Sequence, residues 1–131
     1  MMNTPISYSV EPVMGDYLKH YKFSISELAY FIDIVNSPNS DHLRVQFTLI
    51  GKGTGIYHTG NAFKVFSAVL YILHIVMKET GKTKLSFSSH LHLLSRIKLY
   101  DRFCSFMVKK GSATTWFYED DSRYREYEIT F

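Results

Sequence analysis

The chain has 131 residues, of which 46% are apolar and 16% aromatic. This content excludes an intrinsically disordered chain and predicts a single domain over residues 1–131 with a hydrophobic core. The net charge of +3 is only mildly basic, whereas dedicated nucleic-acid-binding domains carry a larger or more clustered positive charge.

The chain shows no signal for export or for insertion into a membrane. Residues 1–5 contain neither basic side chains nor a long apolar run, so we expect no secretion signal. The longest apolar stretch, Val65 to Met77, is about 13 residues long and too short to span a bilayer. The single cysteine, Cys104, fits a reducing compartment. We therefore expect a cytoplasmic protein without a membrane partner.

The first half of the chain is expected to consist mainly of strands. Residues 6–10 alternate apolar and polar side chains, and Pro12 ends this strand. The pattern of residues 14–26 is ambiguous, and residues 16–21 within it fit one or two turns of helix. The alternation in residues 43–50 predicts the clearest strand of the chain. Two further strands are predicted on either side of it, at residues 27–35 and 56–58.

The period of the hydrophobic pattern changes at the first predicted helix. Apolar side chains then recur at spacings of three and four residues, which predicts a helix over about residues 62–79 that Gly81 ends. Asn61 or Thr59 is expected to cap the first turn of this helix. The remaining predicted elements are a strand at 84–88, a helix at about 93–109, and a C-terminal hairpin of residues 114–118 and 125–131.

This order of elements predicts an α+β fold with a mixed, mostly antiparallel sheet. A helix that connects two neighbouring strands implies that these strands are parallel. We expect the parallel pair to consist of residues 56–58 and 84–88. A parallel pair that spreads apart at the start of a helix is a natural ligand cleft.

The most informative motif is a turn of small residues directly before the first helix, Tyr57-His58-Thr59-Gly60-Asn61-Ala62. The first turn of a helix presents backbone N–H groups and a partial positive charge, so this junction is suited to a phosphate group. The alternative is a plain strand-to-helix turn in which Gly60 supplies the backbone conformation.

The order of elements and two local sequences resemble the GNAT superfamily of acetyltransferases over roughly residues 27–131. Gly60-Asn61-Ala62 matches the Gly-x-Ala end of the family's turn before the long helix. The segment Ser95-Arg96-Ile97-Lys98-Leu99-Tyr100-Asp101-Arg102 resembles the family's second helix with its Leu-Tyr pair.

The resemblance implies a cofactor site and a catalytic acid. Acetyl-CoA is the implied cofactor, and Tyr100 is the implied general acid that protonates the departing thiolate. The alternative for Tyr100 is an aromatic side chain on the buried face of its helix. The backbone N–H groups implied to bind the cofactor are those of Thr59, Gly60, Asn61, Ala62 and Phe63.

The chain departs from the family pattern at three positions. Tyr57 replaces the usual Gln or Arg, Leu93 stands where an Asn is frequent, and strand 56–58 lacks the Glu that often acts as general base. His58 is the titratable side chain near the turn and is the candidate base, with a half-exposed strand histidine as the alternative. These departures favour a non-catalytic protein.

Two surfaces are candidates for binding a partner. The second predicted helix carries the basic residues Arg96, Lys98 and Arg102, and the C-terminal hairpin carries Trp116 and Tyr118. Each surface has a structural alternative, namely a solvated helix face and a strand pair with one side on the core. Acidic side chains at the hairpin turn argue against nucleic acid there, so a protein is the expected partner.

Other residue types that often carry chemistry are expected to be inert here. His90 and His92 lack a third metal ligand at a usual spacing, so no metal site is predicted. Cys104 is expected to be a buried, unreactive thiol. It shares the apolar side of the second helix with Ile97, Tyr100, Met107 and Val108. The polar side is expected to hold Lys98, Asp101, Arg102, Ser105 and Lys109.

Two interpretations follow. In the first, the chain is a small GNAT-like, non-catalytic binding or accessory protein that acts on a host or viral macromolecule. Segments 59–66 and 95–100 also resemble small tailed-phage proteins, which implies the host cytoplasm as its location. In the alternative, the chain is an acyl-CoA-dependent N-acetyltransferase, in which proximity of the two substrates supplies much of the rate.

Overall fold

The computed structural model describes residues 7–13, 17–25, 28–50, 62–111, 113–120 and 123–131. Within these ranges, seven strands form one sheet and two helices pack against it. The α+β class predicted from the sequence is confirmed. The elements are β1 (Tyr8–Pro12), β2 (Leu18–Ile25), β3 (Leu28–Val35), β4 (His42–Ile50), α1 (Ala62–Thr80), β5 (Lys84–His90), α2 (Leu94–Gly111), β6 (Thr114–Asp120) and β7 (Tyr124–Thr130).

The sheet is mixed and mostly antiparallel, as predicted. Its strands lie in the order β1-β2-β3-β4-β5-β7-β6. β4 and β5 are parallel, and the other neighbouring pairs are antiparallel. The parallel pairing follows from the connection, because α1 carries the chain back to the starting end of β4 before β5 begins.

The helical turns predicted for residues 16–21 are wrong, because Leu18–Ile25 form strand β2 between β1 and β3. Tyr21 and Phe23 are buried on one side of this strand, whereas Lys22 between them is exposed. Pairing with a strand on each side, together with burial of two aromatic side chains, outweighs the weak helical preference of the local sequence.

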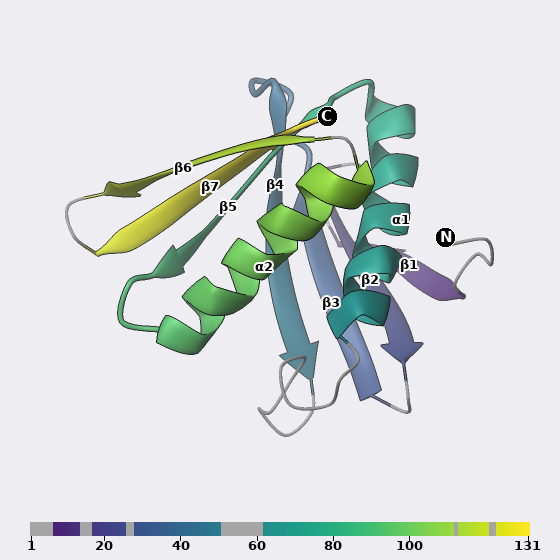
Figure 1. Ribbon diagram of the computed structural model, residues 1–131. Coiled ribbons are helices and arrows are strands. Elements are labelled where there is room, and N and C mark those ends of the chain that lie inside the picture. The colour runs from purple at the N-terminus through teal and green to yellow at the C-terminus, as the bar shows by residue number, and fades with distance from the viewer. Residues whose placement is uncertain (1–6, 14–16, 26–27, 51–61, 112, 121–122) are drawn as a thin grey trace.

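The parallel strands β4 and β5 part along their length (Figure 1). β4 runs to Ile50 and β5 to His90, but within the described residues the two strands pair only at their beginnings. The predicted partner of β5, residues 56–58, lies outside the described residues, and the observed parallel partner is β4. The paired residues are His42 with Lys84, Leu43 with Leu85, and Arg44 with Ser86.

Both helices lie on the same face of the sheet (Figure 1). Phe66 of α1 and Phe103 of α2 pack edge-on with ring centroids 5.3 Å apart. They belong to one hydrophobic core that includes Ile32 of β3 and Leu85 of β5. In the part of the chain that the structure describes, neither helix covers the opposite face of the sheet.

The end of α1 confirms the role predicted for Gly81. This glycine has a φ angle of +75°, a conformation that side chains with a Cβ atom rarely adopt. Its N–H donates to the carbonyl of Met77 at 2.8 Å and closes the last turn of the helix. α1 and α2 agree with the predicted helices to within two residues at each end.

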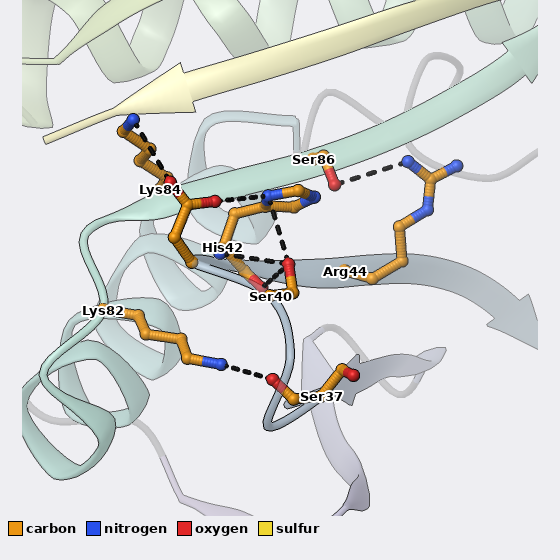
Figure 2. A network of polar contacts seen from close by, with 8 residues as sticks. Ser37, Ser40, His42, Arg44, Lys82, Lys84 and Ser86 are labelled. Atoms are coloured by element: carbon orange, nitrogen blue, oxygen red, sulfur yellow. Dashed lines mark hydrogen bonds and ion pairs between the residues drawn. The ribbon is translucent and has the colours of Figure 1, made fainter.

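Polar contacts join β4 and β5 at their paired end (Figure 2). Lys84 Nζ and Asp41 Oδ2 form an ion pair at 3.5 Å, and Asp41 Oδ1 lies 3.1 Å from Nδ1 of His42. The contact with His42 and the charge of Lys84 lower the pKa of Asp41. Lys82 Nζ donates to the carbonyl of Ser37 at 2.7 Å. The two strands are therefore fixed at one end, and they part toward the other.

Candidate functional site

The start of α1 is the described part of the predicted cofactor site. The helix begins at Ala62, and its first turn contains no acidic residue. The first N–H groups of a helix have no partner inside it, and the helix dipole adds a partial positive charge. His58, Thr59, Gly60 and Asn61 lie outside the described residues, and their roles stay predictions.

Aromatic and basic side chains border the start of α1. Phe63 is 56% exposed, and its ring meets the ring of Phe106 edge-on at 5.4 Å. Nζ of Lys110, in the last turn of α2, lies 6.0 Å from the centre of the Phe63 ring. The exposed Lys64 adds a second positive charge. The sequence indicated Lys110 only as one of the basic residues of the second helix, and the packing of α2 on α1 brings it beside the start of α1.

Tyr100 lies where β4 and β5 part. Its side chain is buried, with only 6% exposed. Its ring packs at 5.6 Å from Phe47 of β4, 5.0 Å from Phe87 of β5 and 5.6 Å from Tyr127 of β7. The predicted general acid is thus also a core residue on the buried face of α2, which was the alternative interpretation for it.

A second aromatic side chain of α2 connects this position to α1. Phe103, one turn after Tyr100, contacts Phe47 of β4 at 5.3 Å and Phe87 of β5 at 5.8 Å. Its ring also packs against Phe66 in the first turns of α1. The diverging strands, Tyr100 and the first turns of α1 therefore share one aromatic cluster.

Asp101 anchors α2 to β7. The hydroxyl of Tyr127 donates to Asp101 Oδ1 at 2.9 Å, and Arg125 Nη1 donates to Oδ2 at 3.2 Å. Burial and this hydrogen bond raise the pKa of Tyr127. Asp101 was expected on the solvated side of the helix, but its carboxylate points to the sheet. Val108, expected on the apolar side, is 45% exposed.

A polar cluster that sequence reasoning missed lies on the sheet face opposite the helices. It consists of Arg44, Ser86, Ser88 and Glu126, and we call it the Arg44 cluster. Arg44 of β4 donates from Nη2 to Ser88 Oγ at 2.8 Å and from Nη1 to Ser86 Oγ at 3.4 Å. It also forms an ion pair with Glu126 of β7. Figure 2 shows Arg44 reaching from β4 toward Ser86 of β5.

The predicted partner-binding residues do not form one patch. Arg96, Lys98 and Arg102 are all exposed on α2. Residues two positions apart on a helix point about 200° apart, so Arg96 and Lys98 lie on different sides. Trp116 and Tyr118 belong to β6, but their side chains are outside the described part of the structure. Their role in binding a protein partner stays a prediction.

Cys104, His90 and His92 all lie within the described part of the chain. Cys104 is buried, and burial raises the pKa of its thiol to about 12. The rings of His90 and His92 lie 5.2 Å apart. Among the described residues, no group of three or more potential metal ligands is found. No described helix is both long enough and apolar enough to cross a membrane.

A separate hollow of about 400 Å³ lies at the other end of α1. Val76, Glu79 and Thr80 of α1 form one of its sides. None of the predicted site residues lines it, so it is distinct from the site at the helix start. Its remaining lining residues are Lys19, Tyr21, Ile34 and Asn36.

The fold is shared with known acetyltransferases. The N-acetyltransferase PseH of Campylobacter jejuni matches 86% of this chain with a TM-score of 0.54 and 13% identity; the match covers 67% of PseH. A GNAT-family acetyltransferase from Bacillus anthracis matches 90% of the chain with a TM-score of 0.51 and 10% identity, again over 67% of that protein. No protein-family model and no curated protein sequence matches the chain.

A third similar structure is RimL, an acetyltransferase of the ribosomal protein L7/L12. It matches 87% of the chain with a TM-score of 0.52 and 7% identity, and the match covers 60% of RimL. PseH has been solved with acetyl coenzyme A and RimL with coenzyme A. These likenesses confirm the predicted GNAT-like fold. The resemblance to tailed-phage proteins stays a prediction.

Proposed function

We propose that this chain is an acyl-CoA-dependent N-acyltransferase. The observation that carries the proposal is the parting of β4 and β5 beyond Arg44 and Ser86, with Tyr100 and the start of α1 in the same aromatic cluster. Strands that part beside a helix N-terminus form a natural ligand site in an α/β sheet. The acetyltransferases that share the fold support this function better than the non-catalytic role first expected.

The charges at the start of α1 fit acetyl-CoA. The cofactor's phosphates are anionic, and the first turn of α1 offers backbone N–H groups without an acidic side chain. Lys64 and Lys110 add positive charge beside it. We expect the N–H groups of Ala62 and Phe63 to hold the phosphates, together with the predicted turn at Thr59, Gly60 and Asn61. When bound, acetyl-CoA supplies the acyl group as a thioester.

Tyr100 is the proposed general acid. Its hydroxyl Oη donates a proton to the departing sulfur, which is a role that a positioned phenol performs well. Three neighbouring aromatic rings and the anchor of Asp101 on Tyr127 hold the α2 backbone and the Tyr100 ring in place. Holding the thioester and the acceptor amine close together in the right orientation supplies much of the rate acceleration. His58 keeps its predicted role as base.

The second candidate function is a non-catalytic binding protein. The low exposure of Tyr100 favours it, because an aromatic side chain packed into the core needs no catalytic role to explain it. The two candidates differ in whether removal of the Tyr100 hydroxyl changes a reaction rate.

The proposal is tested by acetyl transfer to small primary amines, followed through release of the coenzyme A thiol. We expect Tyr100→Phe to lower kcat by about 100-fold, the size typical of a lost general acid. The KM for acetyl-CoA should stay unchanged, because the substitution removes only the hydroxyl group.

The matched control is Tyr124→Phe, since Tyr124 is 39% exposed on β7. This substitution should leave kcat unchanged. Equal rates for the wild type and Tyr100→Phe would remove Tyr100 from the mechanism. A wild-type protein that neither binds acetyl-CoA nor releases its thiol would favour the non-catalytic function.

A further inference from the structure

We propose that the hollow at the C-terminal end of α1 is a second ligand site and that it binds a free amino acid with an apolar side chain. None of the residues that line it belongs to the proposed acyltransferase site, so the inference goes beyond that function and does not depend on it. A helix rises 1.5 Å per residue, which places the two ends of α1 about 27 Å apart. The hollow is therefore remote from the helix start, where acetyl-CoA is proposed to bind.

The hollow has the size and the walls of a small-molecule site. Its volume of about 400 Å³ falls within the range that such sites occupy. The last turns of α1 form one wall, which includes Val76, and the sheet forms the floor, with Tyr21 of β2 and Ile34 of β3. These three side chains are buried and largely apolar. They offer contact to an aliphatic group of the ligand.

Two opposite charges line this hollow without pairing. Lys19 of β2 carries an ammonium group, and Glu79 of α1 carries a carboxylate. The ion pairs found among the described residues include neither side chain. The carboxylate of an amino acid accepts hydrogen bonds from Lys19, and its ammonium group donates to Glu79. A simple anion would be repelled by Glu79 and a simple cation by Lys19, so the pair of charges selects a zwitterion.

The hydroxyl of Tyr21 adds a third polar group to the lining. Tyr21 is only 2% exposed, and none of the hydrogen bonds between described residues involves its hydroxyl. Burial and, as a smaller cause, the charge of Glu79 raise its pKa to about 12, so the hydroxyl keeps its proton at neutral pH. Lys19 and Tyr21 lie two residues apart on β2 and therefore face the same side of the sheet. We assign both as donors to the ligand carboxylate.

The test uses L-leucine as the probe and two-dimensional NMR of the ¹⁵N-labelled full chain at neutral pH. We expect the amide signals of Lys19, Tyr21 and Glu79 to shift in a saturable way. Two analogues each lack one charge, because isocaproate has no ammonium group and isoamylamine has no carboxylate. Each should bind about tenfold more weakly, as expected when a hydrogen bond to a charged group is lost. No saturable shift with L-leucine, or equal binding of L-leucine and both analogues, would overturn the proposal.

Two variants assign the charges to their partners on the ligand. Lys19→Gln should remove the advantage of L-leucine over isoamylamine, and Glu79→Gln should remove its advantage over isocaproate. The matched controls are Lys22→Gln on β2 and Glu11→Gln on β1, which change exposed charges on the other face of the sheet. Both controls should bind L-leucine like the wild type. Wild-type affinity for L-leucine in Lys19→Gln and Glu79→Gln would overturn the proposal.

Titration with acetyl-CoA keeps this site apart from the proposed acyltransferase site. Lys19→Gln and Glu79→Gln should bind acetyl-CoA as the wild type does, because both changes lie at the far end of α1. A wild type that binds L-leucine but not acetyl-CoA would contradict the acyltransferase function alone. A wild type that binds acetyl-CoA but not L-leucine would contradict the amino-acid site alone.

Discussion

At the scale of single residues, the protein combines a buried aromatic core with a few buried polar contacts. Tyr127 is fully buried, stacks on Phe87 at 5.0 Å and donates to Asp101. Burial also raises the pKa of Tyr21 to about 12, with a further contribution from the charge of Glu79. Each of these phenols is therefore protonated in the folded state at pH values where an unfolded chain loses the proton.

These phenols make stability fall at alkaline pH. Because the folded pKa values lie above the unfolded value of about 10, the folded state binds more protons than the unfolded state above that pH. The contribution of these two phenols to stability is then constant below about pH 9 and is lost as the pH rises through 10. We expect the free energy of unfolding, measured with urea at a series of pH values, to fall less steeply with rising pH for Tyr127→Phe than for the wild type.

Tyr127→Phe also removes the hydrogen bond to Asp101, so we expect the free energy of unfolding to fall by about 1 kcal/mol at pH 7. Tyr124→Phe, at an exposed tyrosine of β7, serves as the control and should match the wild type at pH 7. Identical slopes for Tyr127→Phe and the wild type between pH 9 and pH 10.5 would contradict this account of alkaline stability.

At the scale of elements, helices and strands were predicted most accurately where one local pattern of side chains dominates the sequence. Residues 43–50 alternate strictly and form β4, and the spacing of apolar residues after Ala62 gave α1 and its end at Gly81. Strand β2 was missed although residues 21–25 alternate apolar and polar side chains, because residues 18–20 do not continue that alternation. Its conformation also depends on pairing with β1 and β3. Such pairing is a tertiary effect that no window of local sequence contains.

The end of α1 gives a direct test at this scale. We expect Gly81→Ala to destabilise the protein by about 1 kcal/mol, because a Cβ atom disfavours the positive φ angle. Among the described residues other than Gly81 and its two chain neighbours, no heavy atom lies within 4 Å of the added Cβ, so the cost is conformational and not a steric clash. Urea denaturation measures it.

The control at the same position is Gly81→Asn, since asparagine tolerates the left-handed region better than alanine. It should cost less than the alanine variant. If Gly81→Ala unfolded with the same free energy as the wild type, the left-handed conformation assigned to the end of α1 would be contradicted.

At the scale of the whole molecule, the class of the fold could be predicted from the sequence, but the pairing of its parallel strands could not. A helix between two strands predicted one parallel pair, yet the sequence placed the first member at residues 56–58 instead of β4. The site shows the same limit. Gly60 and Tyr100 came from local motifs, whereas Arg44 and Glu126 meet from positions 82 residues apart. Contacts of that kind follow from the sheet order and leave no spacing signal in the chain.

The two faces of the sheet carry different side chains where β4 and β5 part. The helix side carries the start of α1 and Tyr100, and the opposite side carries the Arg44 cluster. The backbone pairing of β4 residues 42–44 with β5 residues 84–86 sets where this opening begins.

The central claim is that the junction before α1 binds the phosphates of acetyl-CoA, and calorimetric titration with acetyl-CoA tests it most directly. The wild type should bind with a micromolar Kd, and Gly60→Trp should abolish binding by filling the predicted turn. Lys78→Trp, an equally bulky change at the exposed far end of α1, should bind normally. Absence of wild-type binding at millimolar acetyl-CoA would contradict the account.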